Sequence, residues 1–552
     1  MVENDYVVVG AGSAGAVVAS RLSENPSVRV LLLEAGPRDG ALSLRIPSAM
    51  AANLKGTRYN WAYQGEPEPG LGGRSLQHDR GKGLGGSSSI NGMVFIRGHA
   101  RDFDGWRQLG CDGWGYADVL PYFKRLETYD GGADTFRGGG GPMRIKQPAA
   151  DHPLTEAFLK AGEQAGYPIT EDICGYRQEG FGRLDRSTWR GERWSTARAY
   201  LDPARGRPNL TIMTGVRVDR LTVDDGRVTG VEGIAADGGP FTARVNREVV
   251  VSAGAVATPQ LLMQSGIGPA EHLREVGIAP LLDRPGVGAN LNEHPDFVLK
   301  YACRQPISLW PVTRPFGRLR AGLQWLLTRG GVCASNHFEA VACIRSGAGI
   351  DYPDIQLTTM PLAMQDDTWE PVPCHAFQIH VGLMRARSRG TVHLRDGDPA
   401  SPPRITVNYL TDPEDRRIMR TGIRLTRELI AQPAYDGLRG KEIFPGEDVR
   451  DDDDLDRALA GAVATQWHLS GTARMGRADD RNAVVDKEGR VIGLGGCRIV
   501  DASVMPVVTN GNTNAPTIMI AEKLSDAIRG VPPLPPIEAD VWQNPEWDKR
   551  QR

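Results

Sequence analysis

The chain has 552 residues, which is too long for one simple hydrophobic core and predicts two large lobes. Its 40% hydrophobic and 24% charged residues are the proportions of an ordinary globular enzyme. Lysine and arginine total 65 against 67 aspartates and glutamates, a formal net charge of −2, and the absence of a basic arm or stripe excludes nucleic-acid binding.

A dinucleotide-binding pattern opens the chain. Residues 6–9 predict a buried strand, Gly10-Ala-Gly-Ser-Ala-Gly15 a turn into a helix, and residues 28–33 a second strand that ends on Glu34. The glycines allow the tight turn, the approach of a pyrophosphate and close packing of helix on strand. The helix N-terminus favours the phosphates, and Glu34 is placed to accept hydrogen bonds from an adenosine ribose. This pattern alone does not separate FAD from NAD.

Two further segments can face the same cofactor. Residues 80–104 contain the small residues Gly85 and Ser88, which let backbone amides close on a phosphate or ring edge, and Asn91, which can offer an amide to the ring. Residues 249–268 predict a strand, a small-residue turn and a helix that starts near residues 258–259.

At this point the chain resembles the glucose–methanol–choline (GMC) oxidoreductases. Residues 80–104 and 254–268 are similar to the two signature motifs of that family, and residues 467–476 and 510–523 continue the likeness. Residues 60–63, 336–340 and 388–394 resemble its choline-dehydrogenase and alcohol-dehydrogenase branch.

The resemblance implies an α/β and α+β fold: a Rossmann-like FAD-binding domain and a substrate domain of antiparallel sheet backed by helices. We assign residues 1–40, 75–110, 185–295 and 456–530 to the FAD-binding domain and residues 41–74, 111–184 and 296–455 to the substrate domain and lid. Some members attach FAD through a histidine just before the asparagine of the first signature; Ile90 stands there, so we expect non-covalent FAD.

The motifs and the resemblance together predict a set of cofactor-binding residues. These are Gly10, Gly12, Ser13, Ala14, Gly15, Glu34, Ala35, Gly85, Ser88, Asn91, Gly92, Val94, Val216, Ala253, Gly254, Asp501, Ala502, Asn514 and Thr517.

The catalytic prediction rests on one histidine. Oxidation of an alcohol by a flavin needs a base for the hydroxyl proton while the ring accepts the hydride, and histidine has a suitable pKa. His468 matches the family's catalytic histidine, and Asn512 matches a partner position that holds His or Asn. Asparagine is no base, so we expect His468 to take the proton and Asn512 to hold the substrate oxygen; Asn514 also suits a helix cap.

The expected reaction is oxidation of a primary alcohol to an aldehyde, as a dehydrogenase or as an oxidase of the aryl-alcohol or hydroxymethylfurfural type. Trp61, Trp467 and Glu339 are candidates to enclose a cationic alcohol such as choline, although Glu339 could equally pair with a structural arginine. Neutral alcohols are preferred here because the residues around His468 differ from the usual choline-dehydrogenase stretch. A flavin-dependent lyase or photodecarboxylase stays open, since fold does not fix function.

The remaining features concern location and partners. Seven scattered cysteines without a C-x-x-C pair predict reduced thiols and no metal site, and no signal peptide or bilayer-spanning window is found, so we expect a cytoplasmic protein. The electron acceptor is dioxygen or a quinone-type respiratory carrier. Residues 531–552 form a proline- and tryptophan-containing arm, which we expect to be ordered. A homo-oligomer formed through this arm is one possibility.

Overall fold

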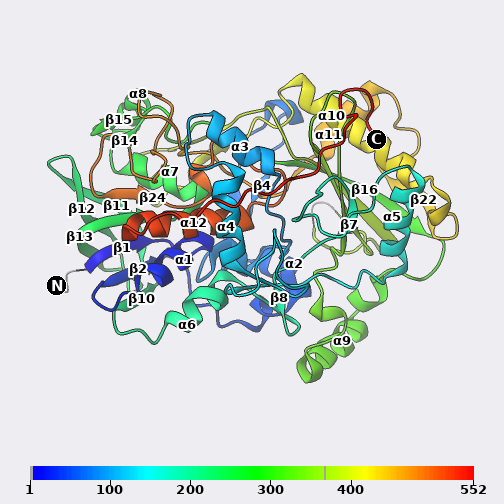
Figure 1. Ribbon diagram of the computed structural model, residues 1–552, viewed down its shortest axis with the longest axis horizontal. Coiled ribbons are helices and arrows are strands. Elements are labelled where there is room, and N and C mark those ends of the chain that lie inside the picture. Colours follow the sequence, from blue (N-terminus) through cyan, green and yellow to red (C-terminus); the bar gives the residue numbers. More distant parts are fainter. Residues whose placement is uncertain (1–3, 366–367) are drawn as a thin grey trace.

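A computed structural model describes residues 4–365 and 368–552. Two sheets lie toward opposite ends of an elongated molecule (Figure 1). The first sheet contains the amino-terminal strands, and the second contains the strands of the middle of the chain. The expected combination of a parallel nucleotide-binding sheet with an antiparallel sheet is confirmed.

The first sheet is mainly parallel. Its strand order is β10-β2-β1-β13, with β24 also paired to β13, and β11 and β12 extend it as an antiparallel meander. Residues 6–9 of β1 are buried, as a continuous apolar run in a two-sided parallel sheet requires. Helices α1 and α12 pack against each other beside it. The bounds are β1 Asn4–Val9, α1 Ser13–Leu22, β2 Val30–Glu34, β10 Leu210–Thr214, β11 Arg217–Asp224, β12 Arg227–Ile234, β13 Pro240–Val251, β24 Cys497–Ile499 and α12 Asn514–Arg529.

The second sheet is antiparallel, in the order β22-β16-β19-β18-β17-β7, with β23 paired to β16. Helices α5 and α10 back it through contacts with β7, β17, β18 and β19. The apolar residues of α10 recur at helical spacing and are buried on one face. The bounds are α5 Pro153–Gln164, β7 Gly180–Arg183, β16 Pro295–Cys303, β17 Ala340–Ile344, β18 Ile355–Met360, β19 Ala376–Leu383, α10 Pro413–Ile430, β22 Arg439–Phe444 and β23 Ala464–Thr465.

The remaining helices lie beside or between the two sheets. They are α2 Met50–Leu54, α3 Ala100–Gln108, α4 Tyr116–Leu126, α6 Asp202–Ala204, α7 Gly254–Gln264, α8 Ala270–Glu275, α9 Pro315–Thr328 and α11 Asp452–Ala462. Within the described residues, no helix is both long and apolar enough to cross a bilayer. Strand β23 pairs with the second sheet although it lies in a segment assigned to the FAD-binding domain, and the domain boundaries otherwise stay a prediction.

Helix α7 begins at Gly254, about one turn before the predicted start, so that Pro259 lies inside the helix. Proline has no N–H to donate to the carbonyl of the residue four positions earlier, Ala255. The hydroxyl of Thr472 donates to that carbonyl instead, at 2.7 Å. A tertiary hydrogen bond thus allows a helix that the local sequence disfavours.

An acidic run starts α11. Asp451 caps the helix by accepting from the Asp454 amide, and residues 452–454 occupy its first turn, where the helix dipole favours acids. The helix cap predicted for Asn514 is wrong: Asn514 is already the first residue of α12, and its side-chain amide donates to the Ser13 hydroxyl at 2.8 Å.

The carboxy-terminal arm is ordered, as expected, and it packs against its own chain. The Trp542 amide donates to the Tyr176 carbonyl, and the Trp542 ring lies over the Arg177 guanidinium at 3.7 Å. Buried Arg345 donates to the Trp547 carbonyl at 3.1 Å. Figure 1 shows this segment running from the end of α12 across to the second sheet.

Replacing Thr472 by valine should lower the free energy of unfolding by about 1–3 kcal/mol, because the buried Ala255 carbonyl loses its donor. The matched test is the same change in a Pro259→Ala background, where the restored amide can donate to Ala255. Thermal unfolding of the four flavin-loaded proteins measures the coupling. An equal loss in both backgrounds would assign the effect of Thr472 to packing alone.

Candidate functional site

A cavity of about 1600 Å³ runs between the two sheets. At one end it is lined by the turn after β1 and the end of β2, and at the other by residues of β16, β18 and β19. Such a long cavity suits an extended cofactor with a substrate beside its reactive end.

The glycines of the first turn make room for backbone. A Cβ on Gly15 would lie 1.8 Å from the Gly10 carbonyl oxygen, and one on Gly10 would lie 2.5 Å from that of Ser252. At Gly12 a Cβ would meet only the Gly86 Cα, at 3.8 Å, and Gly12 lines the cavity. The side of the turn at Gly12 and the N-terminus of α1 therefore face the cavity. The amides and the dipole of a helix N-terminus favour the binding of phosphate.

Glu34 lines the cavity but also holds the chain around it. Its carboxylate accepts hydrogen bonds from the amides of Ala11 at 2.8 Å, Gly36 at 2.8 Å and Gly83 at 2.9 Å. Burial raises the pKa of Glu34, and the three amides oppose that shift. The ribose contact predicted for Glu34 stays a prediction alongside this structural role.

The glycine- and serine-rich segment divides into supporting and lining residues. Ser88 donates to the Gly85 carbonyl at 2.6 Å and accepts from the Thr196 amide, and neither Gly85 nor Ser88 lines the cavity. Asn91 does line it, and its side-chain oxygen accepts from the buried Arg193 guanidinium at 2.8 Å. Arg193, which the sequence analysis missed, thereby orients the Asn91 amide.

The carboxylate of Asp501 joins the carboxy-terminal segment to α7. It accepts from the Gly254 amide at 2.8 Å and from the Thr258 hydroxyl at 2.6 Å. Gly15, Gly85 and Ser88 support the cavity from outside, and the other predicted cofactor residues line it. The lining residues are Gly10, Gly12, Ser13, Ala14, Glu34, Ala35, Asn91, Gly92, Val94, Val216, Ala253, Gly254, Asp501, Ala502, Asn514 and Thr517.

These residues fit FAD. A Cβ built on Gly254, whose φ is +86°, would meet nothing within 4 Å, and one on Gly92 would meet only the Met50 sulfur. The backbone is therefore open at two points of the cavity lining, which leaves room for a flat ring.

His468 and Asn512 meet at the wall of the cavity. The Asn512 amide nitrogen and His468 Nε2 are 3.0 Å apart, and both residues line the cavity. With the amide donating, Nε2 is the acceptor, so the neutral ring carries its proton on Nδ1. This tautomer leaves Nε2 as the basic atom on the cavity side.

His294 and Glu293 support this pair and were missed by the sequence analysis. His294 Nδ1 lies 3.0 Å from His468 Nδ1 and can accept its proton. The Glu293 carboxylate accepts from the backbone amides of His294 at 2.7 Å and His468 at 2.8 Å. The residues are neighbours because β16 and β23 pair through Pro295 and Thr465, a contact that neither local sequence predicts.

Burial sets the charge of the site. It lowers the pKa of His468 well below the usual 6.5, with further lowering by the His294 ring, and it lowers the pKa of His294 to about 3. Burial also raises the pKa of the Glu293 carboxyl to about 7, although the nearby Arg80 guanidinium acts to lower it. Both histidines are therefore neutral at ordinary pH, and His468 is free to accept a proton.

The far end of the cavity has an aromatic wall. Trp467 stacks on Trp369 with ring centroids 5.6 Å apart, and both line the cavity. Trp61 also lines it, but the Lys82 ammonium already lies 4.6 Å from its ring centroid. Trp369 was not among the predicted residues.

Asp296, not Glu339, is the carboxylate in the lining near this wall. Glu339 lies outside the cavity lining and accepts from Arg186 at 3.0 Å and Ser335 at 2.7 Å. Asp296 accepts from Gln466 at 3.1 Å and lies 2.6 Å from His380 Nδ1. Asp296 lies two residues after His294 in β16, and the clue available in the sequence was its place in an Asn-Glu-His-Pro-Asp run.

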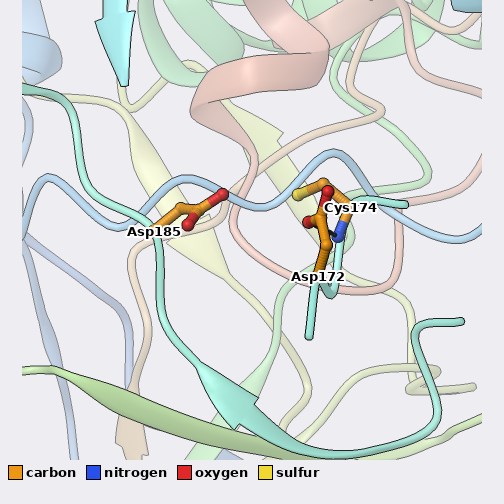
Figure 2. Close-up of side chains that lie close together, drawn as sticks. All are labelled: Asp172, Cys174 and Asp185. Atoms are coloured by element: carbon orange, nitrogen blue, oxygen red, sulfur yellow. Dashed lines mark hydrogen bonds between the residues drawn. The ribbon is translucent and has the colours of Figure 1, made fainter. Parts of the chain in front are cut away.

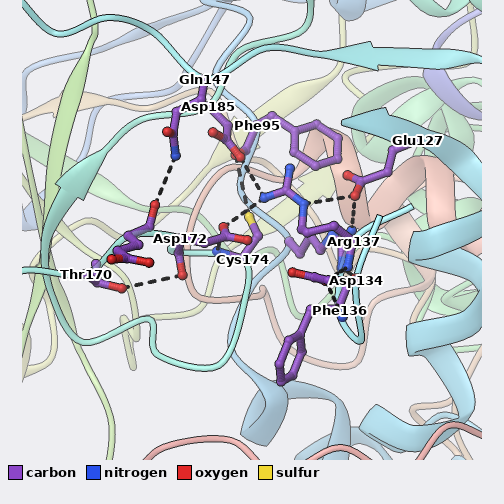
Figure 3. Close-up of polar contacts among 12 residues, drawn as sticks. Phe95, Glu127, Asp134, Phe136, Arg137, Gln147, Thr170, Asp172, Cys174 and Asp185 are labelled. Carbon is purple, nitrogen blue, oxygen red and sulfur yellow. Dashed lines mark hydrogen bonds and ion pairs between the residues drawn. The ribbon is translucent and has the colours of Figure 1, made fainter. Parts of the chain in front are cut away.

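A second cluster of polar side chains lies away from this cavity. Figure 2 shows Asp172, Cys174 and Asp185 gathered together, and within the described residues they are a possible set of metal ligands. Figure 3 shows the buried Arg137 guanidinium between them, 2.8 Å from Asp172, 2.7 Å from Asp185 and 2.9 Å from Glu127. Arg137 supplies the positive charge these carboxylates need, so we assign the cluster to folding.

Comparison with known proteins agrees with this geometry. Two models described as GMC oxidoreductase match residues 4–296 and 386–521. An oxygen-dependent choline dehydrogenase of Brucella suis biovar 1 is 46% identical over 550 residues, with 100% of both chains covered. The enzyme of that name from Pseudomonas aeruginosa is 49% identical over 539 residues, covering 97% of this chain and 96% of the relative.

Solved structures share the whole fold. Pyridoxine 4-oxidase from Mesorbium loti superposes with a TM-score of 0.87 at 32% identity, covering 96% of this chain and 99% of its own. Formate oxidase of Aspergillus oryzae RIB40, described with FAD modification, gives a TM-score of 0.89 at 28% identity, covering 96% and 98%.

The lowered pKa of His468 predicts the pH dependence of flavin reduction by substrate. A base with a depressed pKa stays unprotonated as the pH falls through 6.5, so its contribution to the rate should be level between about pH 6 and pH 9. Rapid-mixing measurements in the Glu293→Gln variant, which removes the carboxyl with a pKa of about 7, isolate the histidine. A loss of rate centred near pH 6.5 in that variant would contradict the assignment.

Proposed function

This chain belongs to the GMC oxidoreductase family and oxidises an alcohol with FAD, and we propose that it converts a primary alcohol to an aldehyde at the His468–Asn512 pair. The observation that carries the proposal is the 3.0 Å contact between His468 Nε2 and the Asn512 amide on the wall of the cavity. FAD, held non-covalently by the residues that line the other end, supplies the hydride acceptor.

We assign proton transfer to His468. The substrate hydroxyl takes the place of the Asn512 amide as donor to Nε2, and Asn512 turns its amide to hold the substrate oxygen. His294 steadies the ring through Nδ1, at 3.0 Å, and Glu293 fixes the backbone on both sides of the contact. The proton therefore moves to a neutral imidazole ring in a buried site. The positive charge formed on the ring then lies next to the substrate oxygen that has lost the proton.

We propose a cationic head group for the alcohol. The buried Asp296 carboxylate and the Trp369–Trp467 wall supply the ion pair and the aromatic faces that a quaternary ammonium group prefers. Relatives that are 46% and 49% identical, both named oxygen-dependent choline dehydrogenase, support the same substrate class. This replaces the neutral alcohol favoured by sequence, since Asp296 was not recognised there.

A neutral alcohol is the second candidate, and the observation that favours it is the 2.6 Å contact of Asp296 with His380. A protonated His380 would neutralise the carboxylate and leave no charge for a cation. Choline and its uncharged isostere 3,3-dimethyl-1-butanol differ in that charge alone, so the ratio of their kcat/KM values separates the two candidates.

We also propose a quinone-type respiratory carrier as the electron acceptor, with dioxygen as the alternative. Slow recolouring of the reduced flavin in air assigns the carrier, and rapid recolouring with peroxide assigns dioxygen. The free cysteines of the structure support a reducing, cytoplasmic location. An oligomer formed through residues 531–552 stays a prediction, because the described contacts of Trp542 and Trp547 are within the chain.

Substituting His468 by alanine should slow alcohol-dependent flavin reduction on the order of 10²–10⁴-fold while the protein keeps its yellow FAD, since a lost base has that effect. Anaerobic bleaching of the flavin band measures the rate. An unchanged rate in a protein that retains FAD would exclude His468 as the base, and bleaching by no alcohol in the unmodified protein would favour a lyase or light-driven reaction.

Replacing Asp296 by asparagine should lower kcat/KM for choline at least about tenfold, the scale of a lost charged contact, and change that for 3,3-dimethyl-1-butanol little. Glu339→Gln is the matched control, because it removes a carboxylate outside the cavity lining. Equal losses on both alcohols in the Asp296 variant would make Asp296 a structural residue.

A further inference from the structure

Helix α9 carries an exposed apolar face. Of its residues only Ala321 and Trp325 are buried, whereas Phe316 is 81% exposed and Leu327 is 84% exposed. The exposed large apolar residues of this helix are Phe316, Leu319, Leu323, Leu326 and Leu327. At 100° per residue they fall within about 100° of arc, on the side away from the buried pair.

The helix is attached to the body along its buried side. The Trp325 indole N–H donates to the Gly191 carbonyl at 2.7 Å, and the Arg329 guanidinium at the C-terminus of the helix lies 4.1 Å from the Trp325 ring centroid. Figure 1 shows α9 projecting from the rest of the molecule. The buried side fixes the helix to the protein, and its apolar face points to solvent. Single exposed leucines are common on protein surfaces, whereas a contiguous apolar face of this kind marks an interaction site.

Positive charge surrounds that face. Arg314, Arg318 and Arg320 lie exposed just before or within the first two turns of α9, and residues 297–338 contain no aspartate or glutamate. Arg314 precedes the first turn, Arg320 lies beside the apolar arc, and both are exposed. The nearby acids have partners: Glu192 pairs with Arg198 and with Arg329 at the end of α9, and Glu370 pairs with Lys55.

We propose that α9 docks this protein onto an anionic membrane surface, lying in the interface with its leucines and phenylalanine among the lipid chains. An exposed apolar arc beside arginines is the pattern of an interfacial helix, and the charge suits acidic headgroups.

Docking through α9 would also orient the cavity. The short helix η7 (Val332–Ala334) follows α9 and packs on η2 (Pro47–Ala49), whose residues Pro47 and Ser48 line the cavity. Trp369 of the aromatic wall precedes Glu370, which feels the charge of Arg318 on α9. The substrate end of the cavity thus lies on the side that would face the bilayer, where a quinone-type acceptor is concentrated.

Vesicle sedimentation of the full-length, FAD-loaded protein tests the proposal. We expect the protein to sediment with vesicles of equal parts phosphatidylcholine and phosphatidylglycerol, much less with phosphatidylcholine alone, and less as salt screens the charges. Phe316→Ser with Leu327→Ser, and separately Arg314→Gln with Arg320→Gln, should each reduce binding about tenfold or more.

The control is Leu109→Ser with Leu281→Ser, which removes two exposed leucines from other surfaces and should leave binding unchanged. Flavin absorbance and alcohol-dependent bleaching, which these changes do not touch, report that each variant is folded. Absence of binding to the anionic vesicles, or equal binding by the α9 variants, overturns the proposal. Concentration-dependent self-association that is lost with Phe316 and Leu327 while no vesicle binds would assign the face to a second copy.

Discussion

The buried carboxylate of Glu34 holds together the parts of the chain that form the cofactor end of the cavity. It accepts amides from the first glycine turn, from the end of β2 and from the glycine-rich segment around Gly83. A buried carboxylate costs free energy unless it is hydrogen-bonded. The three backbone amides must therefore stay within hydrogen-bonding distance of Glu34. The open side of the first turn depends on this bracing.

Other carboxylates hold backbone amides in the same way. Glu293 accepts the amides of His294 and His468, and Asp501 accepts the amide of Gly254. Glu68 accepts amides of residues 407–409 in the same way. Each acid joins segments far apart in the sequence, so the positions of the reacting side chains are set by backbone contacts behind them. The hydrogen bond from the His468 amide to Glu293 limits the motion of His468, and it does so without placing another group in the cavity.

The site combines a common mechanism with a selective far wall. The family match covers the segments that hold His468, Asn512 and the first turn, to which we assign the oxidation of the alcohol. In the proposed function Asp296, His380 and the two stacked tryptophans select the substrate. Asp296 and His380 belong to strands of the second sheet, and Trp369 and Trp467 belong to loops. Because these groups do not support the fold of the first sheet, the substrate can change while the chemistry is kept.

Sequence by itself determined the first strand–turn–helix unit, because glycine spacing and short apolar runs report local structure. The family resemblance pointed to His468 and Asn512, which the structure brings together. Tertiary structure alone decided that Thr472 completes α7, that His294 meets His468, and that Asp296, not Glu339, lines the cavity. Those contacts join residues that are more than 170 positions apart or depend on which face of a strand turns inward. No local pattern encodes such a pairing, since it is fixed only when the two sheets and the loops between them pack together.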